Sequence, residues 1–100
     1  MTRPARTTYV AECFWSGVAE DDLRELDRRV DASVAEGGDD SVRYLGSMLI
    51  VDDEVVLCLF EGPLAAVRRV AQRAGVPFER ILRSTRVPGA HRLADKGEPQ

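Results

Sequence analysis

Histidine, lysine and cysteine are scarce in this 100-residue sequence, which has one histidine, one lysine and two cysteines. The histidine, His91, lies in a stretch of Pro, Gly and charge near the end. A lone histidine there argues against a histidine-based catalytic or metal centre, because such centres need a held geometry. Two cysteines without a secretory signal indicate buried thiols rather than a disulfide. No CxxC or CxxH spacing suggests zinc.

Long apolar runs and a positive net charge are also missing. No apolar segment approaches the roughly 18–20 residues that cross a bilayer, and the first residues lack the hydrophobic stretch of a secretory signal. We therefore expect a cytoplasmic protein without a membrane partner. A net charge of −3 provides no basic field for nucleic acid, and no RNP-like motif appears, so nucleic-acid binding is not expected.

The residues that are present suit one domain, since 44% are hydrophobic and 31% charged. We expect a disordered N-terminus over 1–7, an ordered domain over 8–87 and a flexible C-terminal tail over 88–100. Apolar periodicity predicts two helices, over 19–36 with the stripe Leu23, Leu26, Val30 and Val34, and from Pro63 to Gly75 with the stripe Leu64, Val67, Val70 or Ala71, and Ala74. Strands are predicted at 8–15, 41–51, 54–61 and 78–87.

The order strand–helix–strand–strand–helix–strand predicts a ferredoxin-like α+β fold. Its four-stranded antiparallel sheet has the order 4-1-3-2, with two helices on one face. The segment 55–60, VVLCLF, is apolar at every position, so both faces of that strand must be covered. Since the helices cover one face, we expect a homodimer that joins two sheets face to face as a dimeric α+β barrel, with a cleft between them.

Strand 41–51 is interrupted by Gly46, which suggests a bulge or a close backbone approach. Plain alternation along this strand would put Tyr44 on the same face as Met48 and Ile50. A short turn at Asp52–Asp53 predicts a hairpin with the following strand. The charged side of the first helix is expected to be a solvated face with local ion pairs, and it comprises Arg24, Asp27, Arg28 and Asp31.

Glu12 is the one charge in the first strand, where Val10 and Phe14 share its face. It is either a structural carboxylate at a solvated face or a functional acid on an apolar surface. The polar residues expected in the cleft are Glu12, Tyr44 and Arg83 or Arg80. The candidate catalytic residues are Glu12, Tyr44 and Arg83, and the candidate ligand-binding residues are Glu12, Tyr44 and Cys58.

Several runs resemble a family of small ferredoxin-like proteins catalogued as a domain of unknown function, of which one branch binds nickel. They are Tyr44–Ser47 (YLGS), Leu57–Pro63 (LCLFEGP), Ala65–Arg68 (AAVR) and Ala74–Ile81 (AGVPFERI). The resemblance spans about Tyr9 to Val87 and implies a ferredoxin-like fold, a dimer and no established reaction. The nickel-binding branch is histidine-rich in the second helix, whereas the stretch 70–75 here has no histidine. The resemblance therefore transfers no metal ligand.

Three functions remain open. The first is a non-catalytic dimeric module that binds a small molecule in the cleft. The second is a cofactor-independent enzyme in which Glu12 is the general acid or base and Tyr44 or an arginine holds an oxyanion. The third is divalent-metal binding, for which Glu12, Cys58 and Glu61 offer poor ligands because nickel prefers imidazole. We expect no cofactor and no metal.

Overall fold

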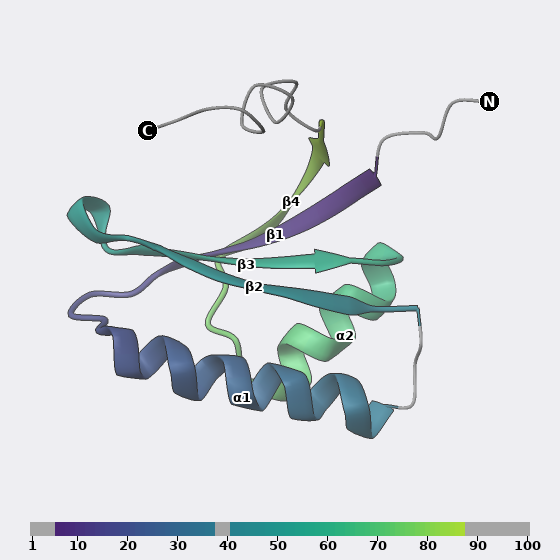
Figure 1. Cartoon of the computed structure of the whole chain (residues 1–100), viewed down its shortest axis with the longest axis horizontal. Helices are drawn as coiled ribbons and strands as arrows, with labels where there is room; N and C mark the ends of the chain where they lie inside the picture. The colour runs from purple at the N-terminus through teal and green to yellow at the C-terminus, as the bar shows by residue number, and fades with distance from the viewer. Residues whose placement is uncertain (1–5, 38–40, 88–100) are drawn as a thin grey trace, which may run out of the picture.

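A computed structural model describes residues 6–37 and 41–87 of the chain (Figure 1). The elements follow the predicted order: β1 (Arg6–Phe14), α1 (Glu20–Gly37), β2 (Arg43–Ile50), the short 3-10 helix η1 (Val51–Asp53), β3 (Val55–Glu61), α2 (Leu64–Ala74) and β4 (Arg80–Arg86). β1 begins two residues before the predicted start. Disorder was predicted over 1–7 and 88–100; residues 6 and 7 belong to β1 instead, and the rest, 1–5 and 88–100, lies outside the described residues.

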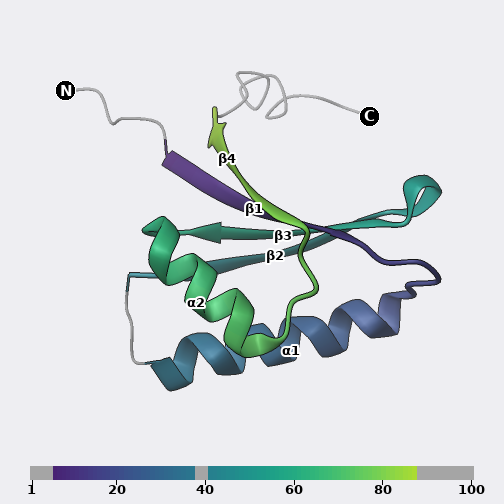
Figure 2. The same cartoon turned by 180° about the vertical axis from the view of Figure 1, so that it is seen from behind.

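The four strands form one antiparallel sheet in the order β2-β3-β1-β4, as predicted. Figures 1 and 2 show both helices on the same side of this sheet, so the molecule has a helix layer and a sheet layer. The central strand β3 carries the densest apolar sequence, VVLCLFE. We call the side of the sheet under the helices the covered face and the other side the open face.

The core lies between the covered face and the two helices. Phe60 and Val56 from β3, Leu26 and Val30 from α1, and Val67 from α2 have no exposed area. Both helices turn the apolar stripes that their spacing predicted toward the sheet, because those side chains recur on one side of each helix. In α1, Leu26 and Val30 are buried, and Leu23 and Val34 are half-buried against the core. One predicted member is wrong: Leu64 is 39% exposed, because it is the first residue of α2 and lies at the edge of the layer.

Side chains join the two helices to each other. The guanidinium of Arg29 on α1 donates through Nε to the carbonyl of Ala74 at 2.9 Å. In the opposite direction, Arg73 on α2 donates through Nη2 to the carbonyl of Ser33 at 2.8 Å, and the Ser33 hydroxyl donates to the Val70 carbonyl at 3.2 Å. The first of these bonds satisfies the carbonyl of Ala74, the last residue of α2, which the helix itself leaves without a partner.

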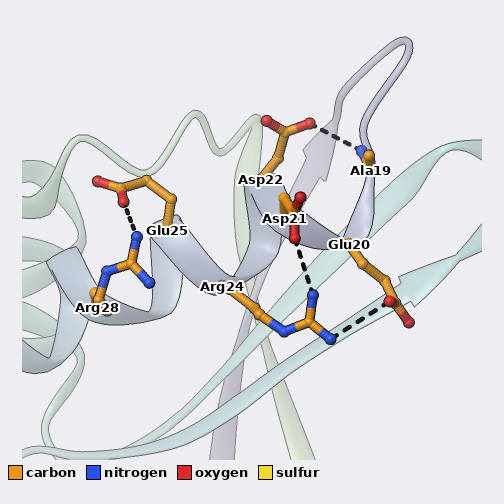
Figure 3. Close-up of polar contacts among 7 residues, drawn as sticks. All are labelled: Ala19, Glu20, Asp21, Asp22, Arg24, Glu25 and Arg28. Carbon is orange, nitrogen blue, oxygen red and sulfur yellow. Dashed lines mark hydrogen bonds and ion pairs between the residues drawn. The ribbon is translucent and has the colours of Figure 1, made fainter.

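The start of α1 is stabilised by its own acidic residues (Figure 3). The Asp22 carboxylate accepts the backbone N–H of Ala19 at 2.9 Å, and acids in the first turn interact favourably with the helix dipole. Exposed intrahelical ion pairs follow along the same helix, namely Arg24 with Glu20 and Asp21, and Arg28 with Glu25. This confirms local ion pairing on the charged side of α1. Asp27 differs, because its carboxylate accepts hydrogen bonds from β2 instead.

A bulge at Gly46 corrects the side-chain directions predicted for β2. Tyr44 lies opposite Phe60, yet Gly46 lies opposite the next residue, Leu59, so Leu45 is an extra residue. Gly46 has a φ of 112°, a conformation that glycine adopts without a steric penalty. The extra residue puts Tyr44 on the same face as Ser47 and Leu49. The prediction that Tyr44 shares a face with Met48 is therefore wrong.

Candidate functional site

The open face is a grid of side chains that the strand register fixes. At the hairpin end, Ile50, Val55 and Phe14 lie in one row across β2, β3 and β1. The next two rows are Met48–Leu57–Glu12–Arg80 and Gly46–Leu59–Val10–Leu82, and the last contains Arg43, Glu61, Thr8 and Ser84. The middle of the open face is therefore apolar, with one charged pair at its β4 side and a polar row at one end.

Large apolar side chains on this face reach solvent in the single chain. Phe14 is 58% exposed and Leu82 38% exposed, and Met48 and Ile50 are also exposed. Leu57 and Leu59 on β3 are half-buried. Scattered exposed apolar residues are ordinary on proteins, but contiguous ones indicate a binding surface.

Glu12 lies among these apolar residues and is bound by an arginine. Its Oε1 accepts a hydrogen bond from Nε of Arg80 at 2.6 Å, across the β1–β4 pair. The Glu12 side chain is 17% exposed and that of Arg80 62%, so the carboxylate is largely covered while the guanidinium faces solvent. The exposed part of this ion pair at the rim of the open face is the Arg80 guanidinium.

The polar row closes one end of the same face. Arg43 donates to the Glu61 carboxylate at 3.3 Å, directly across β2 and β3. Thr8 is buried beside them, and its Oγ1 has no hydrogen-bond partner among the described residues. A buried hydroxyl without a hydrogen-bond partner destabilises the protein. A ligand or a second protein surface that supplies a partner is therefore bound more tightly.

A second polar cluster lies on the covered face, between β2 and α1. The Tyr44 hydroxyl donates to Oδ1 of Asp27 at 2.5 Å, and the Ser47 hydroxyl donates to the same oxygen at 2.9 Å. The Tyr44 ring also packs against Phe60, with centroids 5.0 Å apart. Burial, together with the hydrogen bond to Asp27, raises the pKa of Tyr44 well above its ordinary value. The phenol therefore serves as a fixed donor.

Two free cysteines occupy the covered face beside this cluster. Cys58 lies opposite Ala11, and Cys13 lies opposite Val56 on the same pair of strands. Both side chains are completely buried, and neither forms a disulfide. Hydrogen bonding with Cys58 and burial raise the pKa of Cys13, and the same hydrogen bond lowers the pKa of Cys58. The sequence prediction of buried free thiols is confirmed.

The sequence-predicted site residues do not share one surface. Glu12 and Arg80 meet on the open face, whereas Tyr44, Cys58 and Arg83 belong to the covered side of the sheet. Tyr44 therefore does not face the expected cleft, because the bulge turns it toward α1. A single chain does not bring Glu12 together with Tyr44 or Arg83 as an acid–base pair with an oxyanion holder.

Sequence reasoning missed Asp27, which was assigned to the solvated side of α1. Asp27 follows the buried Leu26, so it lies at the border of the apolar stripe rather than opposite it. Two features of the sequence could have indicated the role of Asp27. One is its position next to the apolar stripe, and the other is the pair of hydroxyls, Tyr44 and Ser47, on a strand that packs against the helix.

The described residues define the class of the protein: a ferredoxin-like α+β domain with an apolar open face and a separate buried thiol and hydroxyl cluster. A model of one protein family, described as "Nickel responsive protein SCO4226-like", matches residues 9–83. The chain belongs to this SCO4226-like family. The resemblance seen in the sequence, to small ferredoxin-like proteins with a nickel-binding branch, is thereby confirmed at the level of the nickel-responsive family.

A solved structure agrees with this assignment. SCO4226 from Streptomyces coelicolor A3(2) has a TM-score of 0.60 and 24% sequence identity, and the match covers 83% of this chain and 98% of that chain. This likeness shows the shared fold. Comparison with curated protein sequences found no match.

Metal-ligating side chains are dispersed in the part of the chain that the structure describes. Over residues 6–37 and 41–87, no three or more His, Cys, Asp or Glu side chains gather where they could hold a metal ion together. Neither described helix combines the length and the apolar character needed to span a bilayer.

Proposed function

We propose that this protein is a small homodimeric binding module that holds a small, largely apolar molecule in a cleft between two open faces. The observation that carries the proposal is the contiguous apolar surface on the open face, which no element of the described chain covers (Figures 1 and 2). A second copy provides a matching apolar face through a two-fold axis, which is the commonest symmetry of oligomers.

The size of the open face suits such a pair. Four strands spaced about 4.8 Å apart and seven residues long span a plane of roughly 19 by 23 Å. Covering about 500 Å² of apolar surface contributes on the order of 12 kcal/mol before the costs of association. Charged pairs at two places, Glu12–Arg80 and Arg43–Glu61, interrupt that surface. They hold the two sheets apart locally, which leaves space for a ligand.

The arrangement favours binding over catalysis. Ligand pockets are mainly apolar with a few polar groups that orient the bound molecule. On the open face, Glu12 is already held by Arg80, and the buried hydroxyl of Thr8 has no partner within residues 6–37 and 41–87. The enzyme alternative requires that Glu12 transfer a proton, so an activity lost in Glu12→Gln but retained in Arg80→Gln would support that alternative instead.

Two leucines of nearly equal exposure provide a matched test of the dimer. Leu82 is 38% exposed on the open face, and Leu64 is 39% exposed at the start of α2 in the helix layer. Leu82→Glu places an unpaired charge in the proposed interface, which costs several kcal/mol, so dimer dissociation should become at least about tenfold easier. Leu64→Glu should leave the dimer unchanged. Light scattering coupled to size exclusion measures both.

A monomeric wild type at micromolar concentration, or equal effects of the two variants, would refute the dimer. Ligand binding is tested separately by thermal shift against a metabolite library. A ligand that binds the folded dimer raises the melting temperature, and the rise continues with the logarithm of the ligand concentration above Kd. The shift should disappear in Leu82→Glu and persist in Leu64→Glu.

Divalent-metal binding is a second candidate, which the match to the nickel-responsive family supports. The carboxylates of Glu12 and Glu61 lie on the open face, where a dimer could add ligands from the second copy. Equilibrium dialysis with nickel, cobalt, copper and zinc decides it. Uptake at micromolar nickel that is lost in Glu12→Gln supports this candidate, and absence of uptake removes it.

A further inference from the structure

A buried hydroxyl lies where the apolar rows of the open face meet the polar row. Thr8 is 2% exposed, and its Oγ1 has no hydrogen-bond partner in the part of the chain that the structure describes. Its neighbours across the sheet are Glu61 on β3 and Ser84 on β4. Ser84 donates through Oγ to the Thr8 carbonyl at 3.0 Å, so this bond does not involve the Thr8 hydroxyl. A buried hydroxyl without a partner costs free energy, whereas a valine of the same shape does not.

The charged side chains described on the open face are arranged in pairs of opposite sign. Arg43 contacts Glu61 in the polar row at 3.3 Å, and Arg80 contacts Glu12 two rows away at 2.6 Å. The Glu61 side chain is 11% exposed, so its carboxylate is largely removed from water. A ligand carboxylate on the polar row would place a second negative charge beside it, which costs affinity. The polar row is therefore suited to an uncharged polar group.

The row next to the polar row provides room for an apolar group. It consists of Gly46, Leu59, Val10 and Leu82. Gly46 carries no side chain, and the position that a Cβ would take there has no other atom within 4 Å. Leu59 beside it is half-buried, and Leu82 is 38% exposed. Successive rows are about 6.6 Å apart, because they are separated by two residues of each strand. An apolar group on this row therefore lies next to the polar row.

We propose that the polar row binds the uncharged hydroxyl of an alcohol or phenol whose apolar body lies on the neighbouring row. Such a site depends on the binding function proposed above, because the cleft encloses the rest of the molecule. The ligand oxygen accepts a hydrogen bond from Oγ1 of Thr8 and donates its own proton to the Glu61 carboxylate, since a hydroxyl is both donor and acceptor. The body of the ligand contacts Leu59 and occupies the space at Gly46.

Access to the Thr8 hydroxyl depends on side chains of the same row. Because Oγ1 is enclosed in the single chain, the ligand reaches it when neighbouring side chains change rotamer. Ser84 is exposed and the Arg43 side chain is 64% exposed, and exposed side chains change rotamer rapidly. The hydrogen bond that forms is shielded from water, so a similar molecule without the hydroxyl is bound less tightly.

The first test compares three probes of similar size with the full chain by isothermal titration calorimetry. The probes are octan-1-ol, its isomer heptyl methyl ether, and octanoate. Octan-1-ol should bind most tightly. The ether accepts a hydrogen bond but donates none, so it should bind about fivefold more weakly. Octanoate should bind at least about tenfold more weakly, because its charge lies beside Glu61. Tighter binding of octanoate than of octan-1-ol would show that the polar row selects an anion, and would overturn the proposal.

Two adjacent threonines of β1 provide a matched pair of variants. Thr8 is buried on the open face, and Thr7 is exposed on the opposite face. Thr8→Val should raise the melting temperature of the protein without ligand, because it removes a buried hydroxyl that has no partner. The same variant should weaken binding of octan-1-ol by about fivefold to tenfold. Thr7→Val should change neither quantity. A threonine with a purely structural role would instead lose stability when its hydroxyl is removed.

Light scattering keeps this result separate from the existence of the dimer. Thr8→Val should remain dimeric, since its hydroxyl binds the ligand and not the second copy. A monomeric wild type would refute the cleft and the hydroxyl site together. A dimeric wild type that binds octan-1-ol no more tightly than Thr8→Val does, or not at all, would overturn the hydroxyl site and leave the dimer standing. Dissociation of Thr8→Val into monomers would also overturn it, by assigning the hydroxyl to the interface.

Discussion

The two faces of this sheet are built from the same strands but differ in what completes them. The covered face buries its apolar residues under α1 and α2, and its Tyr44 and Ser47 hydroxyls are directed at Asp27. The open face exposes Phe14 and Leu82 and has its charged groups paired side by side in the plane of the sheet. One face stabilises the chain by itself, and the other is suited to contact with something else.

The largest change in the free energy of unfolding is expected when an aromatic ring is removed from the core. Phe60→Ala removes a fully buried side chain from the covered face and should lower the free energy of unfolding by about 3–5 kcal/mol. Leu82→Ala on the open face should cost less than about 1 kcal/mol in the monomer, because Leu82 is partly solvated there. Urea unfolding at low protein concentration measures both. Equal losses would break the distinction between the faces.

The buried hydroxyl of Tyr44 provides the next largest effect. Tyr44→Phe removes the donor to the Asp27 carboxylate, and a hydrogen bond to a charged group contributes about 1.5–3 kcal/mol. Tyr9→Phe is the matched control on the same face, since the described structure gives the Tyr9 hydroxyl no hydrogen bond. If the two variants lost the same stability, the bulge at Gly46 would have no energetic role.

Alkaline pH sharpens the same contrast. The folded chain raises the pKa of Tyr44 above the ordinary value of 10.0. Below that value both states keep the proton. Above it the unfolded chain releases the proton while the folded chain retains it, so unfolding becomes more favourable as pH rises. The free energy of unfolding should fall above pH 10, and Tyr44→Phe should flatten this fall relative to wild type. Parallel curves for the two proteins would contradict the assignment.

The smallest effect is expected from the charged pair of the open face. Glu12→Gln and Arg80→Gln should each change the free energy of unfolding by no more than about 1 kcal/mol, because Arg80 is mostly solvated and exposed ion pairs contribute little. The change should shrink further in 1 M salt. A loss of stability as large as that of Tyr44→Phe would show that this ion pair on the open face is shielded from solvent.

Much of the fold could be predicted from the sequence because its signals are local. Apolar spacing identified α1 and α2, the unbroken apolar run at 55–60 identified a central strand, and Gly75 before Pro77 marked the end of α2. The order of elements then restricts the topology to the observed sheet. The position of Leu64 was wrong, since spacing alone does not tell whether the first turn of a helix lies over the core.

The site was predicted less well because the bulge at Gly46 reverses the face to which the preceding side chains of β2 point. Gly46 was identified as a candidate bulge, but its consequence for Tyr44 was not, since alternation was applied through it. Asp27 could not be matched to Tyr44 and Ser47 without knowing which strand lies next to α1. The pairing of Glu12 with Arg80, by contrast, follows from the β1–β4 register and both had been named as polar residues of the cleft.

The crossed arginine contacts between the helices have a mechanical consequence. Arg29 and Arg73 each donate to the backbone of the other helix, so sliding of α1 along α2 would require these hydrogen bonds to break. The same displacement would pull the Ser33 hydroxyl away from the Val70 carbonyl, so three contacts from two sides oppose it.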